Sequence, residues 1–265
     1  MTDAAVPPPP SRTLVQRGPD MLVWGAVILL LLFAFQPVEM SNATRLFTNS
    51  ENMQAFGRDF LKPDFTEWRS YVSKMWLTVQ IALWGTFLAV IIAVPFGLAC
   101  ARNVSPIWLQ QPMRLLMNLL RSIPDLVVGT LFLVAVGLGP FAGVMALTIN
   151  TGAVLAKLFS EAVESIDRGP VEGVRATGAS RLHEIVWGII PQVAPLWTSY
   201  ALYRFESNSR AATVLGLIGA GGIGQLLFDA LNAFAYHQLS AIIIVIIVAV
   251  SLIDLLSQAM RSRLL

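Results

Sequence analysis

Long, uninterrupted apolar segments dominate the chain and set its fold class. A helix needs roughly 20 mainly apolar residues to cross the hydrocarbon core of a bilayer. Several apolar segments come near this length or exceed it, and we expect each to form a transmembrane helix. They are residues 21–35, 75–99, 115–136, 141–159, 193–218 and 239–256. The pattern therefore predicts an all-α, polytopic integral membrane protein with six transmembrane helices.

The first apolar segment could also belong to a cleaved signal peptide. Arg12 and Arg17 precede it, and Ser41 and Ala43 form a small-x-small pattern after it. The leader is long and rich in proline, however, and the small residues lie well beyond the apolar block. We expect a retained helix, preceded by a disordered cytoplasmic tail over residues 1–19.

Lys and Arg between the predicted spans indicate the orientation, because basic residues collect in short cytoplasmic loops. With the N-terminus inside, the short outer segments 137–140 and 219–238 carry no Lys or Arg, whereas every inner segment does. The long outer segment 36–74 is the exception, with five basic and five acidic residues. We expect both termini in the cytoplasm.

Apolar residues at helical spacing occur within that long outer segment: Met53, Phe56, Phe60 and Leu61. They indicate either a short amphipathic helix on the membrane surface or a loop packed on the bundle. The elements divide the chain into a tail (1–19), a first helix with its outer loop (20–70) and a main transmembrane domain (71–265).

The amino-acid composition argues against several classes of function. Charged residues are 13% of the chain and hydrophobic residues 55%, whereas a typical soluble domain has about 25% charged residues. The net charge of +2 is too small for a nucleic-acid interface, so we expect lipid contacts and no nucleic acid. Cys100 is the only cysteine, and His183 and His237 lie far apart, so we expect neither a disulfide nor a metal site.

The inner segment between the fourth and fifth spans, residues 160–191, differs from the other connections. A Gly-Pro pair should end the fourth helix, residues 171–177 can form a short helix, and Gly178 can form a turn. A second helix should cover 181–190, with Pro191 in the first turn of the next span. The alternative is a solvated loop, but a rigid hairpin is what a membrane subunit needs to receive motion from a soluble partner.

This hairpin resembles the EAA motif of bacterial ABC-importer permeases, which forms the coupling helix that docks into a groove on the ATPase subunit. Glu172, Gly178 and Pro191 match the motif. Departures from the usual pattern occur at Gly173, Val174 and Gly188. The resemblance implies contact with the ATPase for Glu172, Gly173, Arg175, Gly178, Ala179 and Pro191.

The runs LLRSIPDLVVGTLFLVAVGLGPFAGV, RGPVEGVRATGAS and YRFESNSRAATVLGLIGAGGIGQLL resemble phosphonate-importer permeases, a group that includes carriers of phosphite and phosphate. The resemblance covers about residue 75 to the C-terminus. It implies the fold of a type I ABC-importer permease, with a second permease copy in a homodimer, two ATPase subunits and an extracytoplasmic binding protein. ATP and Mg²⁺ would be bound by the ATPase, with no cofactor in this chain.

Ionisable residues inside the spans are costly and usually face a cavity or a partner. Arg121 and Asp125 are four residues apart in the third predicted span, on one helix face, with Pro124 between them. They indicate either a structural ion pair or part of the translocation path.

The fifth span carries Arg204, Glu206 and Arg210. Glu206 and Arg210 can pair at i,i+4, whereas Arg204 lies on another side with Ser207 and Asn208. Guanidinium and hydroxyl donors suit a phosphorus oxyanion, so we expect Arg204, Ser207, Asn208 and Arg210 to line the path. The alternative is interhelical packing and pairing.

A glycine-rich run satisfies G-x-G-x-x-G, with glycines at Gly219, Gly221, Gly222 and Gly224. A dinucleotide site would need a preceding strand, which a helical membrane bundle does not offer, and the chain has no Walker A sequence. We therefore expect a bend at the outer face, as part of a gate or of the contact with the binding protein. No catalytic residue is expected in this chain.

Two other functions compete with import of a phosphorus oxyanion. The first is an ABC permease for another small solute, such as an amino acid. The second is a secondary transporter or a membrane-embedded enzyme, although an enzyme would require a cluster of His, Asp or Glu that the sequence does not display.

Overall fold

The computed structural model describes residues 14–44 and 50–263, and throughout these ranges the regular elements are helices. The chain divides into two units, residues 1–58 and 59–265. The predicted disordered tail falls largely outside the described residues. Its last part is helical, because the first helix begins at Leu14.

The first unit contains α1 (Leu14–Phe35), the short 3-10 helix η1 (Met40–Thr44) and most of α3 (Ser50–Phe60). The apolar part of α1 covers Asp20–Phe35, in agreement with the predicted first span, but it is shorter than a bilayer requires. The helix α3 confirms that the apolar spacing around Phe56 marks a helix. Its place on a membrane surface stays a prediction.

The second unit is a helical bundle built around α4 (Trp68–Cys100) and α7 (Pro140–Glu164), the helix pair with the most extensive contact. Glycines let the two backbones approach closely. A Cβ at Gly85 would lie 2.8 Å from Leu147, and one at Gly97 would lie 2.8 Å from Phe159. Small residues at helix interfaces are typical of membrane bundles, where close packing replaces the hydrophobic effect between helices.

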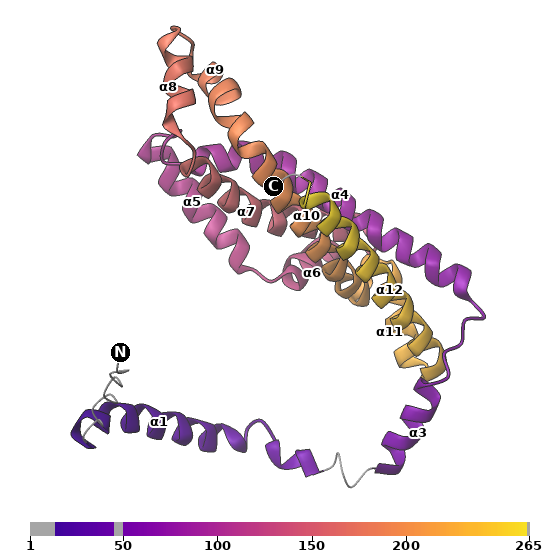
Figure 1. The fold of residues 1–265 in the computed structure, drawn as a ribbon. Helices are drawn as coiled ribbons and strands as arrows, with labels where there is room; N and C mark the ends of the chain where they lie inside the picture. The colour runs from indigo at the N-terminus through magenta and orange to yellow at the C-terminus, as the bar shows by residue number, and fades with distance from the viewer. Residues whose placement is uncertain (1–13, 45–49, 264–265) are drawn as a thin grey trace, which may run out of the picture. The chain divides into compact units, whose positions relative to one another are not determined.

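The remaining helices of this unit surround that pair or extend beyond it (Figure 1). They are α5 (Ile107–Ser122), α6 (Asp125–Val136), α8 (Arg168–Ala176), α9 (Arg181–His183), η2 (Glu184–Ile189), α10 (Ile190–Leu215), η3 (Gly216–Ala220), α11 (Ile223–Asn232) and α12 (Tyr236–Arg261). Figure 1 shows α8 and α9 projecting beyond one end of the bundle, with α11 near the opposite end.

The described residues contain three unbroken helices long and apolar enough to cross a membrane, namely α4, α7 and α12. Two bent pairs raise the number to as many as five: α5 with α6, bent by 88°, and the segment Arg181–Ala220 with α11, bent by 58°. Six continuous spans were predicted. The all-helical class is confirmed, whereas the predicted span 115–136 is broken; the 58° bend follows the predicted span 193–218, at the glycine run where a bend was expected.

The predicted helix 115–136 breaks at Ile123 and Pro124, and the reason is the proline. Pro124 has no backbone N–H to donate and disfavours helical geometry in the residue before it. Ile123 is accordingly extended, with φ −84° and ψ 124°. The amide of Asn150 on α7 donates a hydrogen bond to the carbonyl of Ile123 over 3.0 Å, which satisfies a backbone group that the break leaves free.

Candidate functional site: a projecting hairpin and the charged residues of the bundle

The hairpin of α8, α9 and η2 follows α7 after a short break. The carboxylate of Asp167 caps α8 by accepting a hydrogen bond from the backbone of Gly169 over 3.0 Å. Helix α8 therefore begins at Arg168, slightly before the expected position. Gly178 has φ +78° and open space around it, so its backbone angle, not crowding, calls for glycine at the tip.

An ion pair holds the two arms of the hairpin together. The guanidinium of Arg175 on α8 donates to both oxygens of Glu184 on η2, over 2.9 and 3.0 Å. These hydrogen bonds lower the pKa of Glu184 and raise that of Arg175. Gly188 permits the arms to approach, since a Cβ there would lie 3.1 Å from the Cα of Val171. The departure from the EAA pattern at Gly188 thus has a packing reason in this chain.

Polar contacts tie the hairpin and the end of α7 to α5 and to the turn between α4 and α5. Arg181 donates to the carbonyl of Val104, and Glu164 at the end of α7 pairs with Arg114. The backbone N–H of Arg102 also donates to Glu164, over 2.8 Å. A pocket of about 310 Å³ lies among the turn, the end of α7 and the hairpin. Movement of the hairpin must therefore strain these contacts or carry the α4–α5 turn with it.

The predicted coupling residues occupy three places on the hairpin. Glu172, Gly173 and Arg175 lie on α8, with exposed side chains at Glu172 and Arg175. Gly178 and Ala179 form the turn at the tip. Pro191 lies in the first turn of α10, at the base of the hairpin, as its sequence position predicted. Their contact with an ATPase stays a prediction.

Within the bundle, Arg121 and Asp125 do not share a helix, which corrects the expectation of one helix face. Arg121 is exposed in the last turn of α5, whereas Asp125 opens α6 beyond the break. Asp125 instead interacts electrostatically with Arg204 on α10. Among the described residues, Oδ1 of Asp125 and Nε of Arg204 have no hydrogen-bond partner although both atoms are buried.

Asn208 lies at the centre of a buried polar network that joins three helices. Its carbonyl oxygen accepts from Thr151 on α7 over 2.8 Å, and its amide donates to Thr86 on α4 over 2.8 Å. Arg204 donates to the same Thr151 hydroxyl over 3.1 Å. Asn208 is fully buried, so in this conformation it holds helices together.

The predicted pair of Glu206 and Arg210 is confirmed, with 3.1 Å between the guanidinium and the carboxylate. The structure adds two partners from α12 that sequence reasoning missed. Asp254 pairs with Arg210 over 3.3 Å, and Arg261 pairs with Glu206 over 3.1 Å. A signal for Asp254 was present, because it is an acidic residue inside a strongly apolar segment.

The glycine-rich run forms a tight connection between two helices, η3 and α11. Gly219, Gly221 and Gly222 all have positive φ, a geometry that favours glycine. A Cβ at Gly224 would overlap the carbonyl oxygen of Thr213. The N–H of Ile223 donates to the Thr78 hydroxyl on α4 over 2.9 Å, which fixes the connection to the bundle. A role as an outer gate stays a prediction.

Comparison with known proteins places this architecture in a family. Residues 93–264 match the family model described as binding-protein-dependent transport system inner membrane component. A phosphite transport system permease protein of Stutzerimonas stutzeri is 36% identical over 94% of this chain and 89% of its own length. A putative cryptic phosphonate transport system permease protein of Escherichia coli is 58% identical over 45% of this chain and 98% of its own length.

A solved structure with the same fold is an inward-facing conformation of the MetNI methionine ABC transporter. The similarity has a TM-score of 0.67 at 20% identity and covers 76% of this chain and 99% of the compared chain. At this level of identity the similarity concerns the fold alone.

Proposed function

As the chain belongs to the family of binding-protein-dependent transport system inner membrane components, we propose that it is the permease subunit of an ATP-driven importer of phosphorus oxyanions. The main support for this substrate class is the similarity to a phosphite permease along almost the entire chain. The higher identity to a phosphonate permease over nearly half of the chain supports the same class.

In this proposal the hairpin receives motion from the ATPase. Its α8 arm follows α7 after a short break, and its η2 arm continues into α10 without interruption. A push on α8 therefore acts on both helices, and the Arg181–Val104 contact extends it to the α4–α5 turn. Closure of two ATPase subunits on ATP would drive the path between outward-facing and inward-facing states by rigid-body motion of helices.

The proposed assembly has two permease copies, two ATPase subunits that bind ATP and Mg²⁺, and a binding protein on the outer side. Both termini and the hairpin face the cytoplasm, in agreement with the distribution of Lys and Arg. Helix α11, which follows the glycine connection, lies near the opposite end of the bundle from the hairpin, which suits contact with the binding protein (Figure 1).

Transport by the reconstituted complex tests the proposal. The permease, its ATPase and its cognate binding protein are placed in vesicles, and ATP-dependent accumulation of methylphosphonate, phosphite, phosphate and methionine is compared. We expect accumulation of at least one phosphorus compound and none of methionine. Accumulation of methionine alone would support the alternative of an amino-acid permease, and accumulation without ATP would indicate a secondary transporter.

A further inference from the structure

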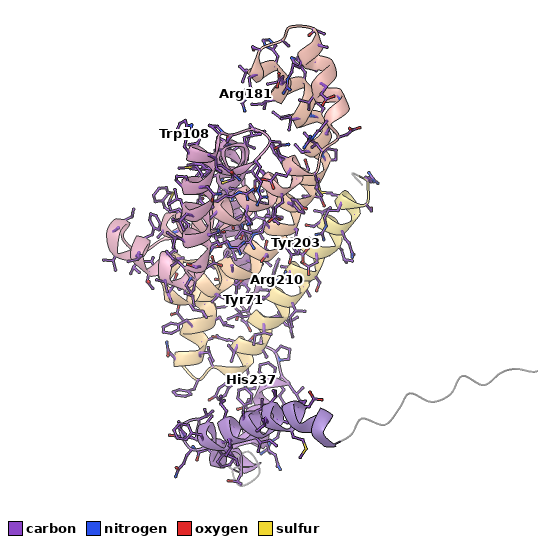
Figure 2. All side chains as sticks on the ribbon, turned by 90° about the vertical axis from the view of Figure 1, so that its left-hand side faces the viewer. Tyr71, Trp108, Arg181, Tyr203, Arg210 and His237 are labelled. Carbon is purple, nitrogen blue, oxygen red and sulfur yellow. The ribbon has the colours of Figure 1, made fainter. Side chains whose placement is uncertain are left out.

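A cluster of four charged side chains, Glu206 and Arg210 from α10 with Asp254 and Arg261 from α12, lies where α10 packs against α12, a helix long and apolar enough to cross a membrane. Two arginines face two carboxylates, so the cluster has no net charge. The side chain of Arg210 is nevertheless 48% exposed and that of Asp254 is 40% exposed. Figure 2 shows Arg210 beyond Tyr203 along α10, away from the hairpin that carries Arg181. Exposed charged side chains on helices of a membrane bundle need an explanation, because they are costly in contact with lipid.

The two sides of α12 at this level have opposite character. Asp254 and Arg261 are seven residues apart, so they lie on one face two turns apart. Leu252 and Leu256 lie on the opposite face, each more than 60% exposed. The leucine face suits lipid. The charged face does not, because an ionised side chain in contact with hydrocarbon costs several kcal/mol.

The exposed side of α10 continues this polar surface. Tyr203, Ser207 and Arg210 follow at spacings of four and three residues, which places them on one helix face. The guanidinium of Arg261 lies 5.9 Å from the ring centre of Tyr203, so the surface runs without interruption from α10 to α12. Asn208, by contrast, points into the bundle and is fully buried. Only the first of these two faces is exposed in this conformation.

The strengths of the two pairs at Arg210 differ. Its contact with Glu206 measures 3.1 Å, and Glu206 is well shielded, with a side chain 14% exposed. Its contacts with Asp254 measure 3.3 and 3.4 Å and join two exposed side chains. An exposed pair of this kind contributes little free energy, so an anion can replace the Asp254 carboxylate at small cost. Such an exchange gives weak, reversible binding, which suits a path that must release its solute.

We propose that Glu206, Arg210, Asp254 and Arg261 form part of the wall of an aqueous translocation path, and that a phosphorus oxyanion contacts Arg210 there in place of Asp254. The substrate class in this inference rests on the proposed function, whereas the wall itself rests on the geometry. The guanidinium can donate two parallel hydrogen bonds to two oxygens of the anion.

Thiol labelling of the intact complex tests the wall. In a Cys100→Ser background, Ser207→Cys places a thiol on the polar face without removing a charge, and Leu252→Cys places a matched thiol on the exposed apolar face of α12. An anionic thiosulfonate reagent reacts with thiolate in water. An apolar environment raises the pKa of a thiol, and each pKa unit lowers the thiolate fraction about tenfold. We therefore expect the thiol at position 207 to react about tenfold faster, or more, than the thiol on the apolar face.

The outcomes distinguish the proposed path wall from the proposed substrate class. Equal rates at the two positions overturn the wall, even in a complex that transports phosphite. Slow reaction of Ser207→Cys with disulfide cross-linking between two copies also overturns it, because the face is then a dry interface. Fast reaction in a complex that transports no phosphorus oxyanion supports the wall and contradicts the proposed function.

Asp254→Asn tests the exchange at Arg210. Bound phosphite is expected to slow labelling of Ser207→Cys, and the half-protecting concentration is the phosphite concentration that halves the labelling rate. Loss of the competing carboxylate should lower this concentration by about two- to fivefold, which corresponds to the free energy of an exposed ion pair. Asp229→Asn, an exposed carboxylate on α11, serves as the control. An unchanged half-protecting concentration in Asp254→Asn overturns the exchange.

Discussion

At two glycines of this bundle, the absence of a side chain allows helices to pack closely. Gly188 allows η2 to lie against Val171, and Gly224 allows α11 to lie against the end of α10. A Cβ would be crowded against Val171 at Gly188 and would overlap the Thr213 carbonyl oxygen at Gly224. The hairpin and the outer connection, which form opposite ends of the proposed mechanism, therefore both depend on close packing.

Replacement of Gly224 by alanine should destabilise the protein. The added methyl group overlaps the Thr213 carbonyl oxygen, which belongs to backbone and cannot rotate away. Overpacking of this kind costs about 1–3 kcal/mol, and we expect a lower thermal midpoint of the purified complex. Gly57→Ala is the control, because nothing lies within 4 Å of a Cβ at that position. Equal midpoints for the two variants would contradict the packing.

Glu184→Gln should loosen the hairpin. It removes the charge that receives two hydrogen bonds from Arg175, so amide hydrogen exchange in α8 should become faster at neutral pH. Glu161→Gln, which removes the carboxylate of an exposed i,i+4 pair with Lys157, should leave exchange in α8 unchanged. Faster exchange in the control alone would show that another contact holds the arms together.

The same pair gives a pH dependence with a defined sign. The pKa of Glu184 is lower in the folded protein than its ordinary value of 4.5. Its contribution to stability is therefore fully present above pH 4.5 and is lost as the pH falls through the lower folded value. We expect the hairpin distance, measured by paired spin labels on α8 and η2, to stay constant from neutral pH down to about 5. A change within that interval would exclude the ion pair as its cause.

At the scale of elements, the break between α5 and α6 separates what the sequence can predict from what it cannot. Proline at 124 and the apolar length were both visible, and they suggested one span with weakened hydrogen bonding. The structure shows an 88° bend instead, and the amide of Asn150 on α7 donates a hydrogen bond to the Ile123 carbonyl that the break leaves free. Contacts between distant segments are not encoded in local periodicity, so the bend had to come from the structure.

Asn150→Ala tests how much this hydrogen bond contributes to stability. Loss of the amide leaves the Ile123 carbonyl without its partner in a site shielded from water, at a cost of about 1–3 kcal/mol. We expect a lower thermal midpoint of the complex. Asn118→Ala, which changes an exposed asparagine on α5, provides the comparison. A midpoint equal to that of Asn118→Ala would indicate that water replaces the amide.

For the whole molecule, the apolar segments predicted the helical class, and the resemblance of the hairpin predicted the family. Charge spacing within one helix correctly predicted the Glu206–Arg210 pair, because both partners lie on α10. The contributions of Asp254 and Arg261 could not be predicted, since they depend on how α12 packs against α10. The burial of Asn208 has the same origin, because α4 and α7 supply its partners.

Cross-linking from the hairpin to the ATPase tests the central claim most directly. In a Cys100→Ser background, a thiol at Glu172→Cys on the exposed side of α8 is joined by a short bifunctional reagent to neighbouring proteins in the assembled importer. The matched control is Gln225→Cys, an exposed position on α11. We predict a cross-link from residue 172 to the ATPase, with a yield that changes on addition of ATP, and none from residue 225. Cross-links to the ATPase from residue 225 and none from residue 172 would contradict the claim that this hairpin transmits the motion.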